Sequence, residues 1–317
     1  MEWRETAAEL ERARSEQALW ISGPHGALFA ILTPAAPHVV PADLCVLMPT
    51  RTRWRPGRMP VKVARSLAAR GFTTVRLDCH GHGQSEGEAV ISGRDFVSGE
   101  DVVAAIRHLR KRLGFQRFVI AGYCSDALSG LAAFPTEGNA IAAIVALAVP
   151  VLRNPENEWD RKYVLDAMLD GRKLRRYLKF PRGWTRKLAS AGRALARSAL
   201  RPTDCNRFRF AAGFEFEALV RSGARALFIF GREDLYYWEF QKVERELIAP
   251  LSPRSRRLIE VEVWPGRAHV AGDVQLEQAL YLRAADWIAA LHPAGEAQLP
   301  DADVSKRPWP NVCSELP

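Results

Sequence analysis

Short, almost fully apolar segments recur along the chain, and stretches with helical spacing separate most of them. A run of this kind, bounded by turn residues, is typical of a strand that is buried on both faces of a sheet. Eight segments are predicted to be strands: 18–21, 27–33, 44–48, 73–77, 118–121, 141–149, 226–230 and 258–263. Helical spacing predicts helices over 60–70, 96–113 and 274–291. The alternation predicts an α/β fold with a doubly wound, mostly parallel sheet.

The alternation is interrupted once, over residues 151–222, where several basic segments have helical spacing and no strand pattern occurs. An insertion at this point would cover the carboxyl ends of the strands as a helical lid. The α/β core is therefore expected in two parts, residues 18–150 and 223–292. Residues 293–317 are rich in proline and small polar residues, which predicts a loose C-terminal tail.

The segment 118–134 has a strand-turn-helix pattern that is able to carry a nucleophile. Gly122-Tyr-Cys124 falls where a nucleophile elbow, Gly-x-Ser-x-Gly, would place Gly-x-Ser. Such a turn lifts the side chain to the top of the sheet and places it at a helix N-terminus, which favours an anion. A thiol there should ionise more easily than a free one, so Cys124 is the predicted nucleophile. Ser125 is the rival, but it lies one position late.

Two loops after later strands supply an acid and a base. Asp234 closes the short loop after the strand 226–230, and His269 follows the strand 258–263. The chain order of nucleophile, acid and histidine is that of the nucleophile-elbow enzymes. The sequence therefore predicts that His269, oriented by Asp234, takes the proton from the nucleophile. Glu233 stays open as the acid, because loops slip by one residue.

These motifs together resemble the α/β-hydrolase fold superfamily over roughly residues 18–292. Asp78-Cys-His-Gly-His-Gly-Gln-Ser85 is similar to the family's Asp-x-x-Gly-x-Gly-x-Ser loop, and Gly231-x-x-Asp234 and Gly266-x-x-His269 match its acid and histidine loops. A cysteine in the elbow resembles the subset that includes dienelactone hydrolases, polyhydroxyalkanoate synthases, exosortase-associated hydrolases and carrier-protein aminoacyl shuttle transferases. The resemblance implies a Cys-His-Asp triad.

The chain departs from the family's pattern at two places. Asp126 replaces the second glycine of the elbow; its carboxylate either tunes the thiol, binds substrate, or is a first-turn acid favoured by the helix dipole. The family's His-Gly after the third strand is Met48-Pro-Thr-Arg51 here. Pro49 cannot donate a hydrogen bond. The oxyanion hole is therefore expected to combine the backbone N–H of Ser125 with that of Thr50 or Arg51.

Arginines follow this strand closely and are candidates for binding substrate. Arg53 and Arg55 lie in the loop Arg51-Thr-Arg-Trp-Arg55, which is expected to hold an anionic group. By contrast, His80 and His82 are expected only to pack the loop after the fourth strand.

The five cysteines are scattered and odd in number. They are Cys45, Cys79, Cys124, Cys205 and Cys313. No pair has Cys-x-x-Cys spacing, so neither a disulfide framework nor a zinc site is expected, and no cofactor is called for. Cys45 and Cys79 have the setting of core or strand-end residues, which are usually inert.

The net charge of +9 is concentrated in one segment. Residues 151–210 hold 16 Lys/Arg and 6 Asp/Glu, a balance of +10, so the remainder sums to −1. A solvated helical face is the simplest explanation, and no nucleic-acid-binding motif accompanies the charge. An acidic carrier protein or a phosphate-bearing substrate such as coenzyme A would suit the segment. The N-terminus is acidic and no apolar window reaches the length of a membrane span, which predicts a soluble, cytoplasmic protein.

The sequence thus predicts a cysteine-dependent acyl hydrolase or acyltransferase that acts on a small acyl ester or thioester through a thioester acyl-enzyme. A non-catalytic α/β-hydrolase-like protein that binds a ligand or a partner under its lid is the alternative. In a catalyst, the Cys124 sulfur, the His269 ring and the Asp234 carboxylate should form one connected chain.

Overall fold

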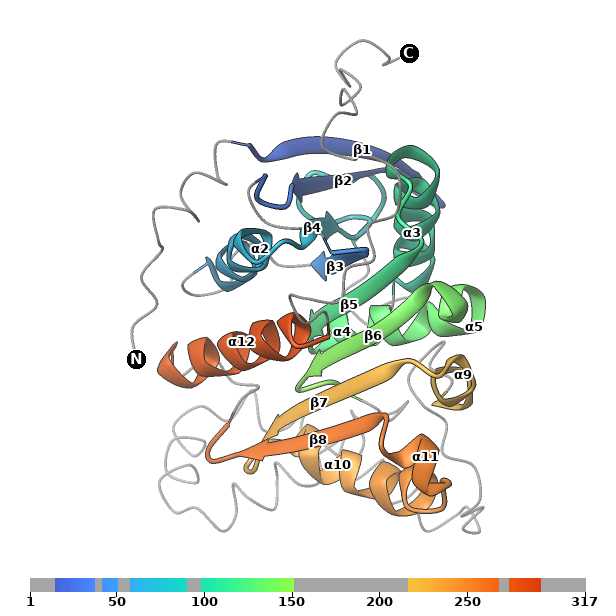
Figure 1. The fold of residues 1–317 in the computed structure, drawn as a ribbon, viewed down its shortest axis with the longest axis vertical. Helices are drawn as coiled ribbons and strands as arrows, with labels where there is room; N and C mark the ends of the chain where they lie inside the picture. Colours follow the sequence, from blue (N-terminus) through green and yellow to red (C-terminus); the bar gives the residue numbers. More distant parts are fainter. Residues whose placement is uncertain are drawn as a thin grey trace, which may run out of the picture. The chain divides into compact units, whose positions relative to one another are not determined.

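The described part of the chain forms one sheet with helices on both faces (Figure 1). The computed structural model describes residues 15–37, 42–50, 58–89, 98–150, 216–267 and 274–291. The strands are β1 (Gln17–Gly23), β2 (Gly26–Thr33), β3 (Leu44–Thr50), β4 (Thr73–Asp78), β5 (Arg117–Tyr123), β6 (Ile141–Leu147), β7 (Arg225–Gly231) and β8 (Ile259–Trp264). All eight predicted strands are therefore confirmed.

The sheet has the order β1-β2-β4-β3-β5-β6-β7-β8. β1 and β2 form an antiparallel hairpin, and β2 is antiparallel to β4. The neighbours from β4 across to β8 are all parallel. The predicted doubly wound, mostly parallel sheet is confirmed. Its parallel part brings the carboxyl ends of β3, β5, β6, β7 and β8 to one edge, where ligands bind in such sheets.

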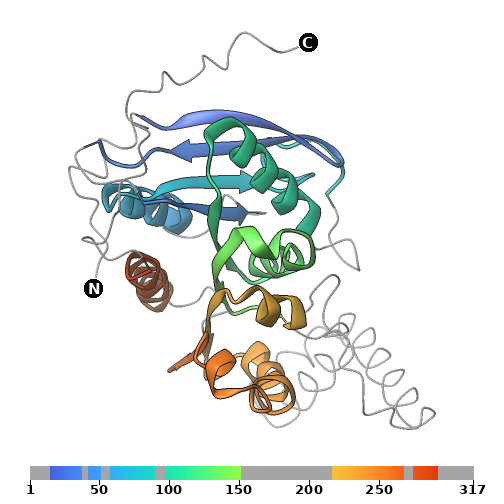
Figure 2. The same cartoon turned by 45° about the vertical axis from the view of Figure 1, so that its right-hand side comes forward.

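Helices cover the sheet in two groups. The helices are α2 (Met59–Ala69), α3 (Gly99–Leu113), α4 (Ser125–Ala132), α5 (Phe134–Glu137), η3 (Gly138–Ala140), α9 (Phe216–Ser222), α10 (Leu235–Val243), η4 (Glu244–Ile248), α11 (Pro253–Arg256) and α12 (Val274–Ala289). Figure 2 shows α2 and α12 on one face, with α3, α5, α9 and α10 on the other. Within the described ranges, none of these helices combines the length and the apolar character that a membrane crossing requires.

The loop after β4 is tied down by its own polar residues. The backbone N–H of Gln84 donates to Oδ2 of Asp78 at 3.0 Å, and the Ser85 hydroxyl donates to the Asp78 carbonyl at 2.6 Å. Gly81 has a φ of 67°, and a Cβ there would collide with the backbone of Ala89. Only glycine fits this position. The Asp-x-x-Gly-x-Gly-x-Ser pattern is thus explained by the fold of the loop itself.

His80 and His82 hold the same loop in place. Nδ1 of the buried His80 lies 2.8 Å from Oδ2 of Asp101 in α3, which also accepts the backbone N–H of His80 at 2.8 Å. Nδ1 of His82 lies 2.8 Å from the His80 carbonyl oxygen. These contacts support the predicted structural role of both histidines.

The core resumes earlier than the sequence predicted. The chain divides into two compact units, and the first unit holds the described residues between 15 and 149 and between 216 and 291. Helix α9 belongs to the first unit, where it contacts α5 and η3 and buries Phe216 and Leu219. The predicted boundary at residue 222 was therefore too late, because the spacing of α9 continues the helical pattern of the segment before it. The rest of the predicted lid, and the predicted tail over 293–317, lie outside the described residues.

Helix α4 should be sensitive to any added volume where it meets the sheet. A Cβ on Gly130 would lie 2.5 Å from Cγ2 of Ile120 in β5. We expect Gly130→Ala to lower the free energy of unfolding by about 1–3 kcal/mol, as overpacked cores do, measured by urea denaturation. The loss should be smaller in an Ile120→Ala background, which removes the colliding methyl group. Equal losses in both backgrounds would contradict this contact.

Candidate active site

Cys124 lies in a strained turn between β5 and α4. Its backbone has φ 54° and ψ −123°, a region that residues with a side chain rarely adopt. Two hydrogen bonds fix the turn: the Cys124 N–H donates to the Leu147 carbonyl at 2.7 Å, and the Leu128 N–H donates to the Cys124 carbonyl at 3.2 Å. A strand, a strained residue and a helix in succession are the geometry of a nucleophile elbow.

The first glycine of the elbow is required by close packing. A Cβ on Gly122 would collide with the backbone of Ala127 in α4. At the position of the second glycine, Asp126 is buried in the first turn of α4, where the helix dipole favours a negative charge. The aspartate side chain that replaces this glycine lines a cavity.

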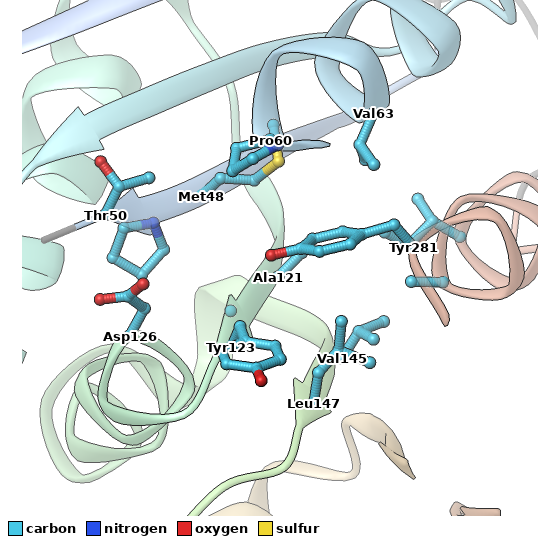
Figure 3. A pocket seen from close by; sticks show the side chains of 14 residues that line it. Met48, Thr50, Pro60, Val63, Ala121, Tyr123, Asp126, Val145, Leu147 and Tyr281 are labelled. Atoms are coloured by element: carbon cyan, nitrogen blue, oxygen red, sulfur yellow. The ribbon is translucent and has the colours of Figure 1, made fainter. Parts of the chain in front are cut away.

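This cavity lies at the carboxyl ends of β3, β5 and β6, between the sheet and helices α2 and α12. Figure 3 shows Asp126 and Thr50 on one side and Tyr281 reaching in from α12. The walls are mostly apolar, with Met48 and Val145 among them. The volume of the cavity is about 30 Å³, which holds roughly two water molecules.

Two of the residues predicted for the oxyanion hole are described: Thr50, which lines this cavity, and Ser125, which follows Cys124 in the elbow. Ser125 is the first residue of α4, so its backbone N–H has no acceptor within the helix. Thr50 is the buried last residue of β3, and its hydroxyl donates to the Leu77 carbonyl at 3.3 Å. Arg51, Arg53 and Arg55 lie outside the described residues. The assignment of the hole therefore stays a prediction.

The loop after β7 separates the two acid candidates by burial. Asp234 is only 5% exposed, and its Oδ2 accepts the Gly231 N–H at 2.9 Å. The side chain of Glu233 is 64% exposed and lies 3.7 Å from the Arg267 guanidinium. A buried carboxylate is able to orient a histidine, whereas an exposed one is screened by water. The structure thus favours Asp234 over Glu233.

Backbone hydrogen bonds join the acid loop to the histidine loop. The Arg232 N–H donates to the Trp264 carbonyl at 2.7 Å, and the Glu233 N–H donates to the Gly266 carbonyl at 3.0 Å. His269 lies outside the described residues, three positions after Gly266. The loop that leads to it is therefore held beside Asp234, while the His269–Asp234 contact itself stays a prediction.

Tyr236 is a site residue that sequence reasoning missed. Its hydroxyl oxygen lies 3.9 Å from Sγ of Cys124, although the two residues are 112 positions apart. Burial, together with the negative charge at Cys124, raises the pKa of Tyr236 above its usual value. The only sequence signal was its place two residues after the predicted acid, at the start of a helix.

The described cysteines differ sharply in environment. Cys45 and Cys79 are fully buried, and burial raises the pKa of the Cys45 thiol. Cys124 is partly exposed. Cys205 and Cys313 lie outside the described residues. Within the part of the chain that the structure describes, no three His, Cys, Asp or Glu side chains converge as metal ligands.

The fold is shared with solved α/β hydrolases. An esterase from Pyrococcus furiosus is similar, with a TM-score of 0.57 and 15% identity over 91% of this chain and 95% of that one. Est1E from Butyrivibrio proteoclasticus, with ferulic acid bound, has a TM-score of 0.52 and 19% identity over 86% and 100%. A putative α/β hydrolase from Agrobacterium tumefaciens has a TM-score of 0.53 and 15% identity over 86% and 94%. No family model and no curated protein matches the sequence. The chain has the α/β-hydrolase fold, as its motifs predicted.

The difference in exposure predicts the order of alkylation. We expect iodoacetamide to label Cys124 faster than Cys45 or Cys79 by about tenfold or more, because the buried thiols react only after local opening. Peptide mapping by mass spectrometry at timed intervals measures all three rates in one sample. Labelling in urea serves as the control, since unfolding should bring the three rates together. Earlier labelling of either buried cysteine in the folded protein would be inconsistent with this site.

Proposed function

We propose that the protein is a cysteine-dependent acyl hydrolase or acyltransferase that acts on a small acyl ester or thioester. The observation that carries the proposal is the strained backbone of Cys124 at the junction of β5 and α4. A non-glycine residue in such a region costs about 1–3 kcal/mol, and strain of this kind concentrates at active sites, where it fixes the reacting side chain. The fold it shares with the Pyrococcus furiosus esterase supports acyl chemistry for this chain.

The proposed reaction has two steps. His269, oriented by Asp234, takes the thiol proton of Cys124, and the thiolate attacks the acyl carbonyl carbon. The oxyanion is held by the backbone N–H of Ser125 and that of Thr50 or Arg51. Collapse of this intermediate breaks the bond to the leaving alkoxide or thiolate, which takes the proton from the histidine. A thioester acyl-enzyme remains.

The second step releases the acyl group. The histidine takes a proton from water or from an acceptor alcohol, amine or thiol, which attacks the thioester and regenerates Cys124. Water completes hydrolysis, and any other acceptor completes transfer. Exchange of an acyl group between two thiols is nearly thermoneutral, so a cysteine nucleophile suits thioester substrates in particular.

The lining of the cavity beside the elbow supports an acyl group as the substrate. Its mostly apolar walls suit the hydrocarbon part of that group, while Asp126 is the polar side chain proposed to contact it. The charge of residues 151–210 supports an acidic carrier protein or coenzyme A as the acyl donor. Arg53 and Arg55 are proposed to bind the anionic part of such a donor.

The proposal is tested by trapping the acyl-enzyme. The protein is incubated with acyl-coenzyme A thioesters and p-nitrophenyl esters of two to eight carbons, and intact mass is recorded at timed intervals. We expect an increase equal to one acyl group, located on the Cys124 peptide, and no increase in Cys124→Ala.

Ser125→Ala is the matched control, because it removes the neighbouring rival nucleophile. The Ser125→Ala variant should still form the acyl adduct on Cys124. Full turnover by Cys124→Ala together with loss in Ser125→Ala would move the nucleophile to Ser125. If no substrate gives an adduct and none is turned over, the non-catalytic alternative is favoured.

The acid is tested by a pair of neighbouring amide substitutions. We expect Asp234→Asn to lower kcat by a factor of about 10² to 10⁴, because the amide cannot hold the histidine as the carboxylate does. The fold should survive, since the asparagine oxygen still accepts the Gly231 N–H. Glu233→Gln should leave kcat within about twofold, as expected for an exposed group. The reverse result would place the acid at Glu233.

A further inference from the structure

We infer that Tyr236 is a catalytic residue of this site: once Cys124 has lost its proton, the Tyr236 hydroxyl donates a hydrogen bond to the thiolate and stabilises it. The inference rests on the proposed function in one respect: it takes Cys124 as the nucleophile. It adds a residue that lies outside the predicted triad and contacts the reacting atom directly.

The strand order explains how Tyr236 reaches the thiol. β6 lies between β5, which carries Cys124, and β7, which leads into α10. Tyr236 is in the first turn of α10, two residues after Asp234, which is the N-cap of that helix. Its side chain therefore extends across the end of β6 and brings Oη to 3.9 Å from Sγ. At this distance, which the large radius of sulfur allows, the Cys124 thiol donates a hydrogen bond to the Tyr236 hydroxyl. Once the thiol has lost its proton, only the phenol O–H is left to donate, so the direction of the hydrogen bond reverses.

The start of α10 is held firmly enough to keep this distance. The Asp234 N–H donates to the Gly231 carbonyl at 3.0 Å, and the Gly231 N–H donates back to Oδ2 of Asp234 at 2.9 Å. The Glu233 N–H is bonded to the histidine loop. One turn therefore presents two groups: the carboxylate proposed to orient the histidine, and the phenol at the thiol.

The environment keeps the phenol in its donor form. Tyr236 is only 9% exposed, so ionisation would place a phenolate in an apolar setting. A thiolate 3.9 Å away disfavours that second negative charge further. The thiol proton of Cys124 therefore goes to the histidine, and Tyr236 retains its own. The thiolate would then be stabilised from two sides, by Tyr236 and by the N-terminus of α4.

The experiment measures how the alkylation rate of Cys124 depends on pH, which requires no acyl substrate. Iodoacetamide labelling of the full chain is followed by peptide mapping between pH 5 and pH 10. A donor to the thiolate lowers the pKa of the thiol, so its loss raises that pKa. We expect Tyr236→Phe to shift the profile upward by about one pH unit, which lowers the rate about tenfold on the acidic side of the profile.

Tyr237→Phe is the matched control. It makes the same chemical change one position along α10, in a ring that packs near Phe230 rather than at the thiol. Its profile should overlay that of the unmodified protein. Slow labelling of Cys45 and Cys79 in each sample verifies that the variants are folded, since both are fully buried.

The outcomes separate this inference from the proposed function. A shifted profile in Tyr236→Phe alone supports the inference, even if no acyl substrate is turned over, in which case only the proposed function fails. Overlapping profiles for the unmodified protein and Tyr236→Phe overturn the inference, even if Cys124 proves essential for turnover. Where turnover is observed, kcat of Tyr236→Phe should fall several-fold with KM nearly unchanged, because the hydroxyl acts on the nucleophile.

Discussion

The close approach of α4 to β5 is the constraint on which the candidate site depends. Gly122 near the end of β5 and Gly130 within α4 both lack the side chain that would hold the helix away from the strand. With the helix that near, the chain has room for a single residue between the two elements. That residue is Cys124, and its backbone takes the strained conformation that the short connection requires.

The geometry of this junction has chemical consequences. The same turn that strains Cys124 leaves it partly exposed at the N-terminus of α4, where unpaired N–H groups favour an anion. Cys45 is buried in β3 and Cys79 is buried directly after β4, and both lack this setting. The difference between a structural and a reactive thiol is therefore a difference of backbone position rather than of residue type.

The loops after β7 and β8 form the other side of the site. Short backbone hydrogen bonds join them, so that the start of α10 and the loop leading to His269 are positioned together. Asp234 and Tyr236 occupy that start two residues apart. The parallel sheet makes this arrangement possible, because it delivers the ends of β5, β7 and β8 to one edge even though those strands are distant in sequence.

Much of this protein is determined by local sequence patterns. Runs rich in apolar residues between turn residues identified all eight strands. The pattern is clearest in β3, β6 and β7, because strands buried on both faces are apolar almost throughout. The elbow was equally recognisable, because the small residues needed for close packing lie within a few positions of Cys124. The order of the acid and histidine loops could be read in the same way, as each follows directly from a predicted strand.

Only the tertiary structure decided the rest. Helical spacing shows that 216–222 has an apolar face but not which surface it covers, so α9 was assigned to the lid instead of the core. The sequence favoured Asp234 as the acid but left Glu233 open, and the two differ in burial, which depends on the loop conformation. The contact of Tyr236 with Cys124 could not be foreseen at all. It arises because the strand order places β7 two positions from β5, and strand order is a property of the assembled sheet.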